Sequence, residues 1–340
     1  MNDRVKWLVV AGVSAVALGA TAVVGVVAWQ QYRVRLDAPS AAAMTAPEEW
    51  ASGDRIVFRN TALGEGYGLV ASVPLDAPAG PRALTGIACD RVDAVADEFS
   101  CLRTERGIAP SYSASLYAND GTAIVTWPLS GVPSRARLSA DGTRIATTSF
   151  VTGHSYATIG FSTETMIHDD AGDDFGNLEE WTLLFNGTPS APIDRNFWGV
   201  TFIDDTSFYA TAGFANSGQT YLVRGDVPTR TLTAVAEDVE CPSLSPDGTR
   251  IAFKRVTAGS GPTVHWTPAI MDLATGEVVT LPESRSIDDQ IEWLDDTTIL
   301  YGMPRADDSG DTDVWALGAD GSGAPRILIE HAWSPSVVRP

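Results

Sequence analysis

Residue types that carry most enzyme chemistry are scarce in this sequence. Lysine occurs only at Lys6 and Lys254, and histidine occurs four times. The histidines form no H-E-x-x-H motif or other paired spacing that would indicate a metal site, and no G-x-S-x-G motif marks a nucleophilic serine. We therefore expect a binding protein rather than an enzyme, with no catalytic residues and no cofactor.

Positive charge is scarce as well. The chain has a formal net charge of −20, although its first 36 residues hold four basic residues and one acidic residue. A surface this negative repels the phosphates of nucleic acids and anionic lipid headgroups, so we expect no nucleic-acid partner. Two interpretations remain: the charge keeps the protein soluble, or it attracts cationic ligands or ions.

Cysteine occurs only at Cys89, Cys101 and Cys241. An odd number allows at most one intramolecular disulfide and leaves one thiol over. Cys89 and Cys101 flank a short segment that we interpret as two adjacent strands, which predicts a disulfide between them. The alternative is that both are small apolar core residues, as free cysteines often are.

One long uncharged apolar run lies near the N-terminus. Residues 7–29 read WLVVAGVSAVALGATAVVGVVAW, and a helix of 23 residues is long enough to cross roughly 30 Å of hydrocarbon. Trp7 and Trp29 stand at its two ends, the positions that interfacial aromatic residues favour. The length predicts an uncleaved signal anchor; cleavage of a signal peptide near residues 41–43 is the alternative.

These features predict a single-pass protein of the cell membrane. Basic residues flank both ends of the apolar run, so the positive-inside rule does not decide its orientation. The short N-terminal tail and the expected disulfide favour a cytoplasmic N-terminus. We expect a cytoplasmic tail at residues 1–6, a transmembrane segment at 7–29, an Ala- and Pro-rich linker at 30–48, and an extracytoplasmic domain at 49–340.

The remainder of the chain contains internal repeats. Residues 138–146 (LSADGTRIA) and 244–252 (LSPDGTRIA) are nearly identical, and residues 202–210 and 293–301 are weaker copies. A fifth copy at residues 51–58 is truncated, and a sixth around residues 95–101 is degenerate. In each copy a tight Asp-Gly or Asp-Asp turn is followed by an alternating apolar strand. The first apolar residues after the six turns are 43 to 48 residues apart, with one larger gap of 63 residues. This period matches one four-stranded blade of a β-propeller.

We therefore predict an all-β fold, a six-bladed β-propeller over residues 49–340. The first unit lacks an inner strand of its own, and residues 334–338 resemble the segment that opens the fifth unit. We expect residues 334–338 to become the inner strand of blade one, which would remove the exposed edges of an open ring. The surplus of the long gap lies within residues 154–180, which we interpret as a surface loop or a binding loop.

The repeat motif is similar to that of a known family. Residues 245–253 (SPDGTRIAF) look like the WD40-like repeat of TolB-like propellers, and residues 313–326 resemble the end of such domains. From residue 89 onward the chain resembles an uncharacterised group of actinobacterial TolB-like proteins that carry an N-terminal signal or anchor. The resemblance implies a six-bladed propeller and leaves the function open, because one scaffold can serve many purposes.

One acidic segment has the side-chain spacing of a calcium loop. Residues 307–313 (DDSGDTD) place oxygen-bearing side chains at alternate positions, with Asp307, Asp311 and Asp313 as candidate calcium ligands. The glycine is misplaced for an EF-hand, and the carboxylate expected at the twelfth position is absent. A solvated loop is therefore the simpler interpretation.

The segments that lead into the six inner strands should surround one mouth of the propeller channel. They combine aromatic residues with charged and polar groups, as ligand sites do. The candidate ligand-binding residues are Asp90, Arg91, Arg135, Asn196, Trp198, Glu240, Asp289, Gln290 and Trp333. The alternative is that these residues only pack and cap the ring. We expect a membrane-tethered protein that binds a protein, peptide or glycan at this mouth; a cell-surface hydrolase or lyase acting in the channel is the alternative function.

Overall fold

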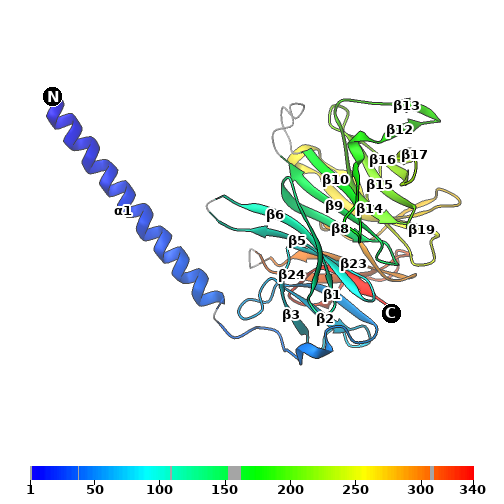
Figure 1. Ribbon diagram of the computed structural model, residues 1–340, viewed down its shortest axis with the longest axis horizontal. Coiled ribbons are helices and arrows are strands. Elements are labelled where there is room, and N and C mark those ends of the chain that lie inside the picture. Colours follow the sequence, from blue (N-terminus) through cyan, green and yellow to red (C-terminus); the bar gives the residue numbers. More distant parts are fainter. Residues whose placement is uncertain (1, 37, 108, 152–161, 307–309) are drawn as a thin grey trace. The chain divides into compact units, whose positions relative to one another are not determined.

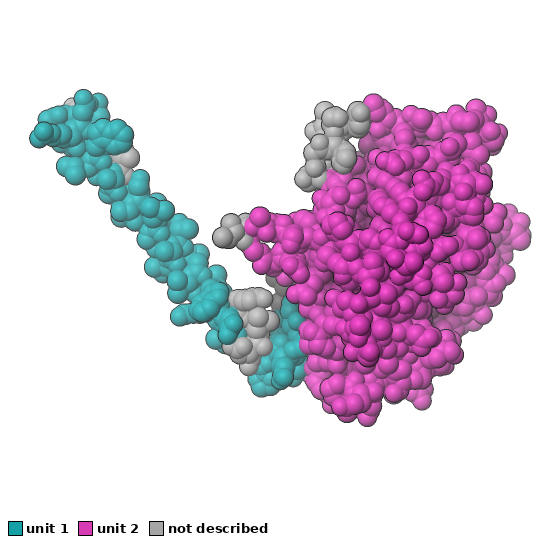
Figure 2. All heavy atoms as spheres, viewed as in Figure 1, with its two compact units in different colours: residues 1–41, 62–67 teal, residues 42–61, 68–340 magenta. Residues whose placement is uncertain are grey.

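A computed structural model describes most of the chain in two compact units, which Figure 2 colours separately. The described residues are 2–36, 38–107, 109–151, 162–306 and 310–340. The first unit contains residues 1–41 and 62–67, and the second contains residues 42–61 and 68–340. Every described strand belongs to the second unit.

The first unit contains one long helix, α1 (Asp3–Leu36). Its segment Asp3–Gln31 contains an 18-residue window with a mean hydropathy of 2.2 and is long and apolar enough to cross a membrane. The helix continues past both ends of the apolar run at residues 7–29. The backbone polar groups of the whole run are therefore paired within the helix, as a lipid environment requires.

The second unit is a ring of six sheets, or blades, whose strands are drawn as arrows in Figure 1. Within each blade the strands lie side by side, from the inside of the ring outward. Blade one comprises β26 (Ala332–Val338), β1 (Arg55–Asn60), β2 (Leu69–Pro74) and β3 (Ala83–Ala88). Blade two comprises β4 (Arg91–Ala94), β5 (Glu98–Glu105), β6 (Ser111–Ala118) and β7 (Ala123–Pro128). Blade three comprises β8 (Val132–Leu138), β9 (Arg144–Val151), β10 (Ser162–Asp169) and β11 (Asp174–Asn177).

The other three blades complete the ring. Blade four comprises β14 (Arg195–Phe202), β15 (Ser207–Phe214), β16 (Gln219–Asp226), β17 (Thr231–Glu237), β12 (Thr182–Phe185) and β13 (Thr188–Ser190). Blade five comprises β18 (Glu240–Leu244), β19 (Arg250–Ala258), β20 (His265–Asp272) and β21 (Val278–Thr280). Blade six comprises β22 (Glu292–Asp295), β23 (Thr298–Pro304), β24 (Thr312–Gly318) and β25 (Arg326–Ile329). Three short 3-10 helices are η1 (Pro47–Glu49), η2 (Leu178–Glu180) and η3 (Gly261–Thr263). The predicted all-β, six-bladed propeller is confirmed.

The two ends of this unit meet in blade one. β26 runs antiparallel to β1, with Arg55 opposite Val338 and Asn60 opposite Ala332. In Figure 1 the C-terminal strand accordingly lies beside the first blade. Residues 334–338, which the sequence assigns to blade one, lie within β26. The ring is therefore joined by hydrogen bonds between its first and last strands, and β1 has a partner on both edges.

The repeated Asp-Gly turn has a specific geometry. In blade three, the Asp141 carboxylate accepts from the Ser139 hydroxyl at 2.6 Å and from the Thr143 backbone N–H at 3.1 Å. Gly142 has a φ of 76°, a conformation that favours glycine. The Ser245–Arg250 turn of blade five repeats these contacts. The recurrence of Ser-x-Asp-Gly-Thr in the sequence thus reflects one hydrogen-bonded turn that reverses the chain between two strands.

The core lies between adjacent blades and begins at the residues that follow these turns. Equivalent residues in the second strands of the six blades are each at most 1% exposed: Ile56, Phe99, Ile145, Phe208, Ile251 and Ile299. Full burial of such a side chain contributes about 1.5–3 kcal/mol relative to exposure. The period that identifies the blades in the sequence is therefore also the period of the core.

Blade four departs from the expected four-stranded pattern. The hairpin β12–β13 extends its outer edge, with β12 parallel to β17. The turn of the hairpin is Asn186-Gly187, whose φ values of 47° and 75° suit a two-residue hairpin loop. Leu183 of β12 is 1% exposed and packs in the core of this blade. The surplus strands of the long gap therefore lie at residues 182–190, beyond the segment 154–180 predicted from the sequence, because residues 162–169 and 174–177 form β10 and β11 of blade three. Residues 152–161 lie outside the described residues.

An acidic group lies where blades two and three meet. Glu98, at the start of β5, packs closely against the turn at Gly142. Burial, together with repulsion from Asp170, Asp97 and Asp141, raises the pKa of Glu98 to about 7. Ionisation of Glu98 above this pKa therefore opposes folding.

Glu98→Gln should stabilise the protein at alkaline pH. A carboxyl whose pKa rises on folding contributes stability below its unfolded pKa of 4.5, and this contribution is lost as the pH rises through about 7. The melting temperature of the variant should exceed that of the wild type at pH 8 and differ little at pH 5. Glu105→Gln, on the exposed end of the same strand, controls for the removal of one negative charge. Equal gains from both substitutions at pH 8 would contradict the local explanation.

Candidate functional site

The segment that leads into blade six supplies most of the acidic groups of the channel. Residues 288–292 carry Asp288, Asp289, Gln290 and Glu292. Basic side chains of blades two, three and five form ion pairs with this segment. Because blades three and six face each other across a six-membered ring, the pairs formed by Arg135 and Arg137 of blade three cross the channel. Contacts between distant parts of the sequence therefore hold the mouth of the propeller together.

The pair formed by Arg91 and Asp289 is enclosed. Arg91 Nη1 lies 2.7 Å from Asp289 Oδ1, and the guanidinium lies 4.8 Å from the ring centre of Trp333. Asp289 is 0% exposed, and its Oδ2 accepts from the backbone N–H of Gly302 at 2.9 Å. Burial lowers the pKa of Arg91 to about 10, with a further contribution from Arg135, although Asp289 opposes both effects. Arg91, Asp289 and Trp333 thus bind one another, and the Asp289 carboxylate has no surface to offer a ligand.

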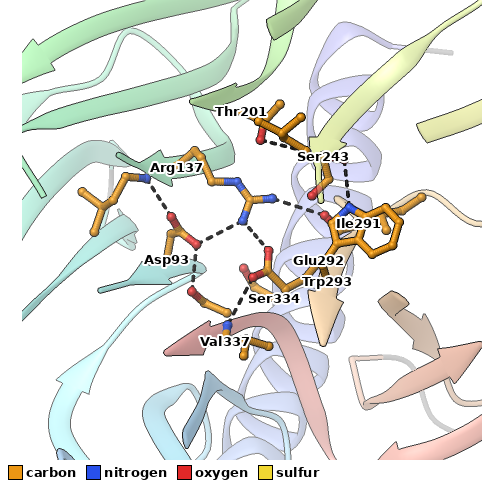
Figure 3. A network of polar contacts seen from close by, with 12 residues as sticks. Asp93, Arg137, Thr201, Ser243, Ile291, Glu292, Trp293, Ser334 and Val337 are labelled. Atoms are coloured by element: carbon orange, nitrogen blue, oxygen red, sulfur yellow. Dashed lines mark hydrogen bonds and ion pairs between the residues drawn. The ribbon is translucent and has the colours of Figure 1, made fainter. Parts of the chain in front are cut away.

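Arg137 of β8 forms the central polar contact of the channel, as Figure 3 shows. Its Nη1 donates to Asp93 Oδ1 at 3.3 Å and to Glu292 Oε2 at 2.5 Å, and its Nη2 donates to the carbonyl oxygen of Ile291 at 3.2 Å. The amide oxygen of Gln290, turned toward the guanidinium, accepts from Arg137 Nε at 2.8 Å. One side chain therefore joins blade three to blade two and to the opposite blade six.

Sequence reasoning pointed to Gln290 but missed Arg137, Asp93 and Glu292. One signal was available: Arg135 and Arg137 alternate along β8, so both lie on the same face of the inner strand. Arg137 lines a second cavity of about 370 Å³, whose lining includes the far ends of several inner strands, whereas Arg135 lines the mouth. The Arg137 network therefore lies deeper in the channel than the candidate residues.

The mouth contains a cavity of about 380 Å³. Its lining comes from blades three, four and five and from the segment that precedes blade six. Four of the candidate residues predicted from the sequence line it: Arg135, Asn196, Trp198 and Glu240. The volume lies in the range of roughly 300–1,000 Å³ that is typical of small-ligand sites.

Three further residues of this cavity determine its charge pattern: Lys254, Asp288 and Trp266. Lys254 Nζ lies 2.7 Å from Asp288 Oδ1 and 4.5 Å from the ring centre of Trp266. Trp266 Nε1 donates to Glu240 Oε2 at 3.2 Å. Burial raises the pKa of Glu240, and the attraction of Lys254 partly offsets this effect. The signal that sequence reasoning overlooked is the rarity of lysine, since Lys254 is the one lysine beyond the N-terminal segment.

The remaining candidates have different surroundings. The amide oxygen of Asn196 accepts from the backbone N–H of Thr163 at 3.1 Å, which holds Asn196 at the cavity wall. The indole of Trp198 lies against Gly213, where a Cβ would come within 2.3 Å of Cη2, so a glycine is needed at this position. Asp90 stabilises blade two, since its carboxylate accepts a hydrogen bond from a backbone N–H of β5 at 2.7 Å. The structure thus brings four of the nine candidates to one cavity, whereas the other five form ion pairs, hydrogen bonds or cation–π contacts within the propeller.

The structure joins Cys89 to Cys101 in a disulfide, with the two Cα atoms 5.4 Å apart. Cys89 lies just before β4, and Cys101 lies in the adjacent strand β5. Cys241 is a free, buried cysteine that also lines the mouth cavity. Its backbone N–H donates to the hydroxyl of Thr211 at 2.9 Å.

The candidate calcium ligands are engaged in other contacts. Asp311 Oδ2 lies 2.7 Å from His331 Nδ1, and Asp313 Oδ1 accepts from Arg305 Nη1 at 2.8 Å. Both carboxylates are almost fully buried. Asp307 lies outside the described residues. A calcium ion would have to compete with Arg305 for the oxygens of these two residues.

The comparisons with known proteins identify the fold. No family model matches the sequence, and no curated protein matches it. Among solved structures, the chain is similar to TolB from Acinetobacter baumannii, with a TM-score of 0.56, 16% sequence identity, and coverage of 85% of this chain and 67% of that chain. A putative TolB from Agrobacterium tumefaciens gives a TM-score of 0.49 at 11% identity, covering 83% and 91%. A puromycin-hydrolyzing peptidase of Mycobacterium tuberculosis gives 0.48 at 12% identity, covering 87% and 48%. At sequence identities this low, the similarity establishes the fold and not the function.

Proposed function

Because the chain has the fold of a TolB-like six-bladed propeller, we propose that it is a membrane-tethered, extracytoplasmic binding protein. Its ligand, a protein, peptide or glycan, occupies the mouth cavity. The observation that carries this proposal is the cavity itself, about 380 Å³ in volume and lined by Trp198 and Trp266 together with charged groups. Aromatic walls with a few placed polar groups are the usual composition of a ligand site.

The state of two channel acids, Asp289 and Glu292, supports binding rather than catalysis. A hydrolase or lyase needs a nucleophile or base that is free to act on its substrate. Asp289 and Glu292, by contrast, are held by Arg91 and Arg137 at 2.7 and 2.5 Å. These carboxylates stabilise the channel, and the neighbouring mouth cavity binds the ligand.

Two features support the location. The segment Asp3–Gln31 of α1 is long and apolar enough to anchor the chain in a membrane. The Cys89–Cys101 disulfide suits an oxidising compartment outside the cytoplasm. A tethered propeller of this kind presents its mouth to soluble or surface-bound partners on one side of the membrane.

Photo-cross-linking in native membranes tests this proposal. A photoreactive residue in place of Gln219, an exposed residue of the cavity lining, should give a specific adduct in the membrane fraction. In the same background, Trp198→Ala should lower the adduct yield about tenfold or more, since a buried aromatic contact often contributes 2 kcal/mol or more to binding. A photoreactive residue at Ser322, in the β24–β25 turn, is the positional control.

Equal adducts at Gln219 and Ser322, or a full yield from a Trp198→Ala protein that melts normally, would contradict binding in the cavity. Recovery of the full chain in the soluble fraction would contradict the membrane tether.

A further inference from the structure

The most exposed charged side chain of the mouth cavity is acidic. The side chain of Asp288 is 68% exposed, whereas those of Lys254 and Arg135 are only 4% and 8% exposed. Lys254 and Arg135 line the cavity but present little side-chain surface, and the Asp288 side chain is the most accessible charged group. The exposed area of each charged side chain, more than the number of charges, determines which charge a ligand contacts.

The Asp288 carboxylate is held in a defined place. Lys254 Nζ donates to its Oδ1 at 2.7 Å, and Arg135 Nη2 lies 3.9 Å from the same oxygen. Desolvation by the surrounding protein acts to raise the pKa of Asp288. The attraction and hydrogen bond of Lys254, together with the attraction of Arg135 and Arg91, outweigh this effect and lower the pKa. Asp288 is thus a fixed, ionised group, and a carboxylate can accept several hydrogen bonds on the side that faces the cavity.

A second carboxylate and two indoles complete the surroundings. Glu240 lies on the same cavity and accepts from Trp266 Nε1 at 3.2 Å. Lys254 already places an ammonium group 4.5 Å from the ring centre of Trp266, which demonstrates that these surroundings suit an amine. Trp198 contributes a further aromatic surface to the lining.

We propose that the mouth cavity binds a primary ammonium group carried on an apolar or aromatic body, with Asp288 as its principal partner. This inference rests on the proposed function of the cavity and names the class of ligand. The ammonium group donates to Asp288, while the apolar body packs against Trp198 and Trp266. The formal net charge of −20 assists by attracting cations toward the propeller.

Three probes that share one aromatic body test the charge preference. Calorimetric titration of the full-length protein in neutral detergent with 2-phenylethylamine, 2-phenylethanol and phenylacetate compares a cation, a neutral molecule and an anion. The amine should bind about tenfold or more tightly than either of the others, as a charged hydrogen bond predicts. Its affinity should fall as salt is raised from about 50 to about 500 mM, because salt screens the attraction.

Two substitutions should change amine binding in opposite directions. Asp288→Asn should reduce the affinity for 2-phenylethylamine to that for the alcohol, and Lys254→Met should increase it by releasing Asp288 and Glu240. Asp320→Asn, in the β24–β25 turn, is the control and should have no effect. Melting curves of each variant establish that the propeller is folded.

The source of the ammonium group is distinguished with larger probes. The tripeptide amide Phe-Gly-Gly-NH₂, with a free or an acetylated N-terminus, tests a peptide N-terminus, and chitobiose in its amino and N-acetyl forms tests an amino sugar. Preference for the charged form of either pair supports the proposal.

Tighter binding of phenylacetate, or an unchanged amine affinity in folded Asp288→Asn protein, would overturn the ammonium proposal while leaving the cavity as a binding site. Absence of amine binding together with a specific Gln219 adduct would reject the ligand class alone. Absence of both would reject the proposed function as well.

Discussion

A chain that ends at Glu330 should not form a cooperatively folded propeller. The truncation removes β26, whose Ala332 and Val338 are at most 2% exposed and whose backbone completes the ladder with β1. It also removes the Ser336 hydroxyl that donates to Asp93 Oδ1 at 2.9 Å in blade two. We expect this loss to exceed the roughly 5–15 kcal/mol by which a typical domain is stable. Thermal scans by circular dichroism should then lack a sharp transition.

A chain that ends at Val338 is the matched control for this truncation. It lacks only Arg339 and Pro340, which are exposed, and loses the hydrogen bond from Arg339 to the carbonyl oxygen of Leu294. Its free energy of unfolding should therefore lie within about 1 kcal/mol of that of the wild type. A synthetic peptide of residues 331–340 should restore cooperative melting to the shorter chain, because it can add to the exposed edge of β1 as a strand. If the shorter chain melts like the wild type, the closure of the ring does not stabilise it.

Local periodicity explains why the fold could be predicted. A turn such as residues 245–250 is stabilised by contacts within six residues, and the apolar residue that follows it enters the core. The turn recurs in blades three to six and the buried apolar residue in all six blades, and both are legible without knowledge of distant contacts. The apolar run near the N-terminus is equally local, so a long apolar helix could be predicted with it.

The hairpin β12–β13 was missed for a different reason. Residues 182–190 form two very short strands, and only the Asn186-Gly187 turn between them carries a strong local signal. Their partner is β17, which follows them by some forty residues and pairs with β12 in parallel. A short strand of this kind is stabilised by tertiary pairing more than by its own sequence.

The polar contacts of the channel could be predicted only in part. Knowing that inner strands line the channel was enough to select Arg135, Asn196, Trp198 and Glu240. The same knowledge did not predict which side chains form pairs, because Lys254 and Asp288 belong to different blades and approach each other only in the closed ring. For the same reason, the sequence predicted that Asp289 contacts a ligand, whereas in the structure its carboxylate is buried against Arg91 and Gly302.

Arg137→Met should lower the free energy of unfolding by about 3–5 kcal/mol at pH 8, since it leaves two buried carboxylates without their cation. Arg137, Asp93 and Glu292 have side chains only 12%, 6% and 14% exposed, so water compensates little for the lost ion pairs. Methionine retains much of the length of the arginine, which limits the effect of a cavity. The melting temperature should fall on the order of 10 °C. Arg103→Met on the exposed part of β5 is the control and should change stability by about 0.5 kcal/mol or less.

Two further measurements separate loss of charge compensation from loss of packing. Burial raises the pKa of Glu292 even when Arg137 opposes it, so removal of the arginine should raise that pKa further. Protonation of Glu292 then removes part of the unpaired charge, and the deficit of Arg137→Met should be smaller at pH 5.5 than at pH 8. Adding Glu292→Gln to Arg137→Met should recover part of the stability at pH 8. A deficit that is independent of pH and unaffected by Glu292→Gln would mean that Arg137 stabilises the ring by its volume and not by its charge.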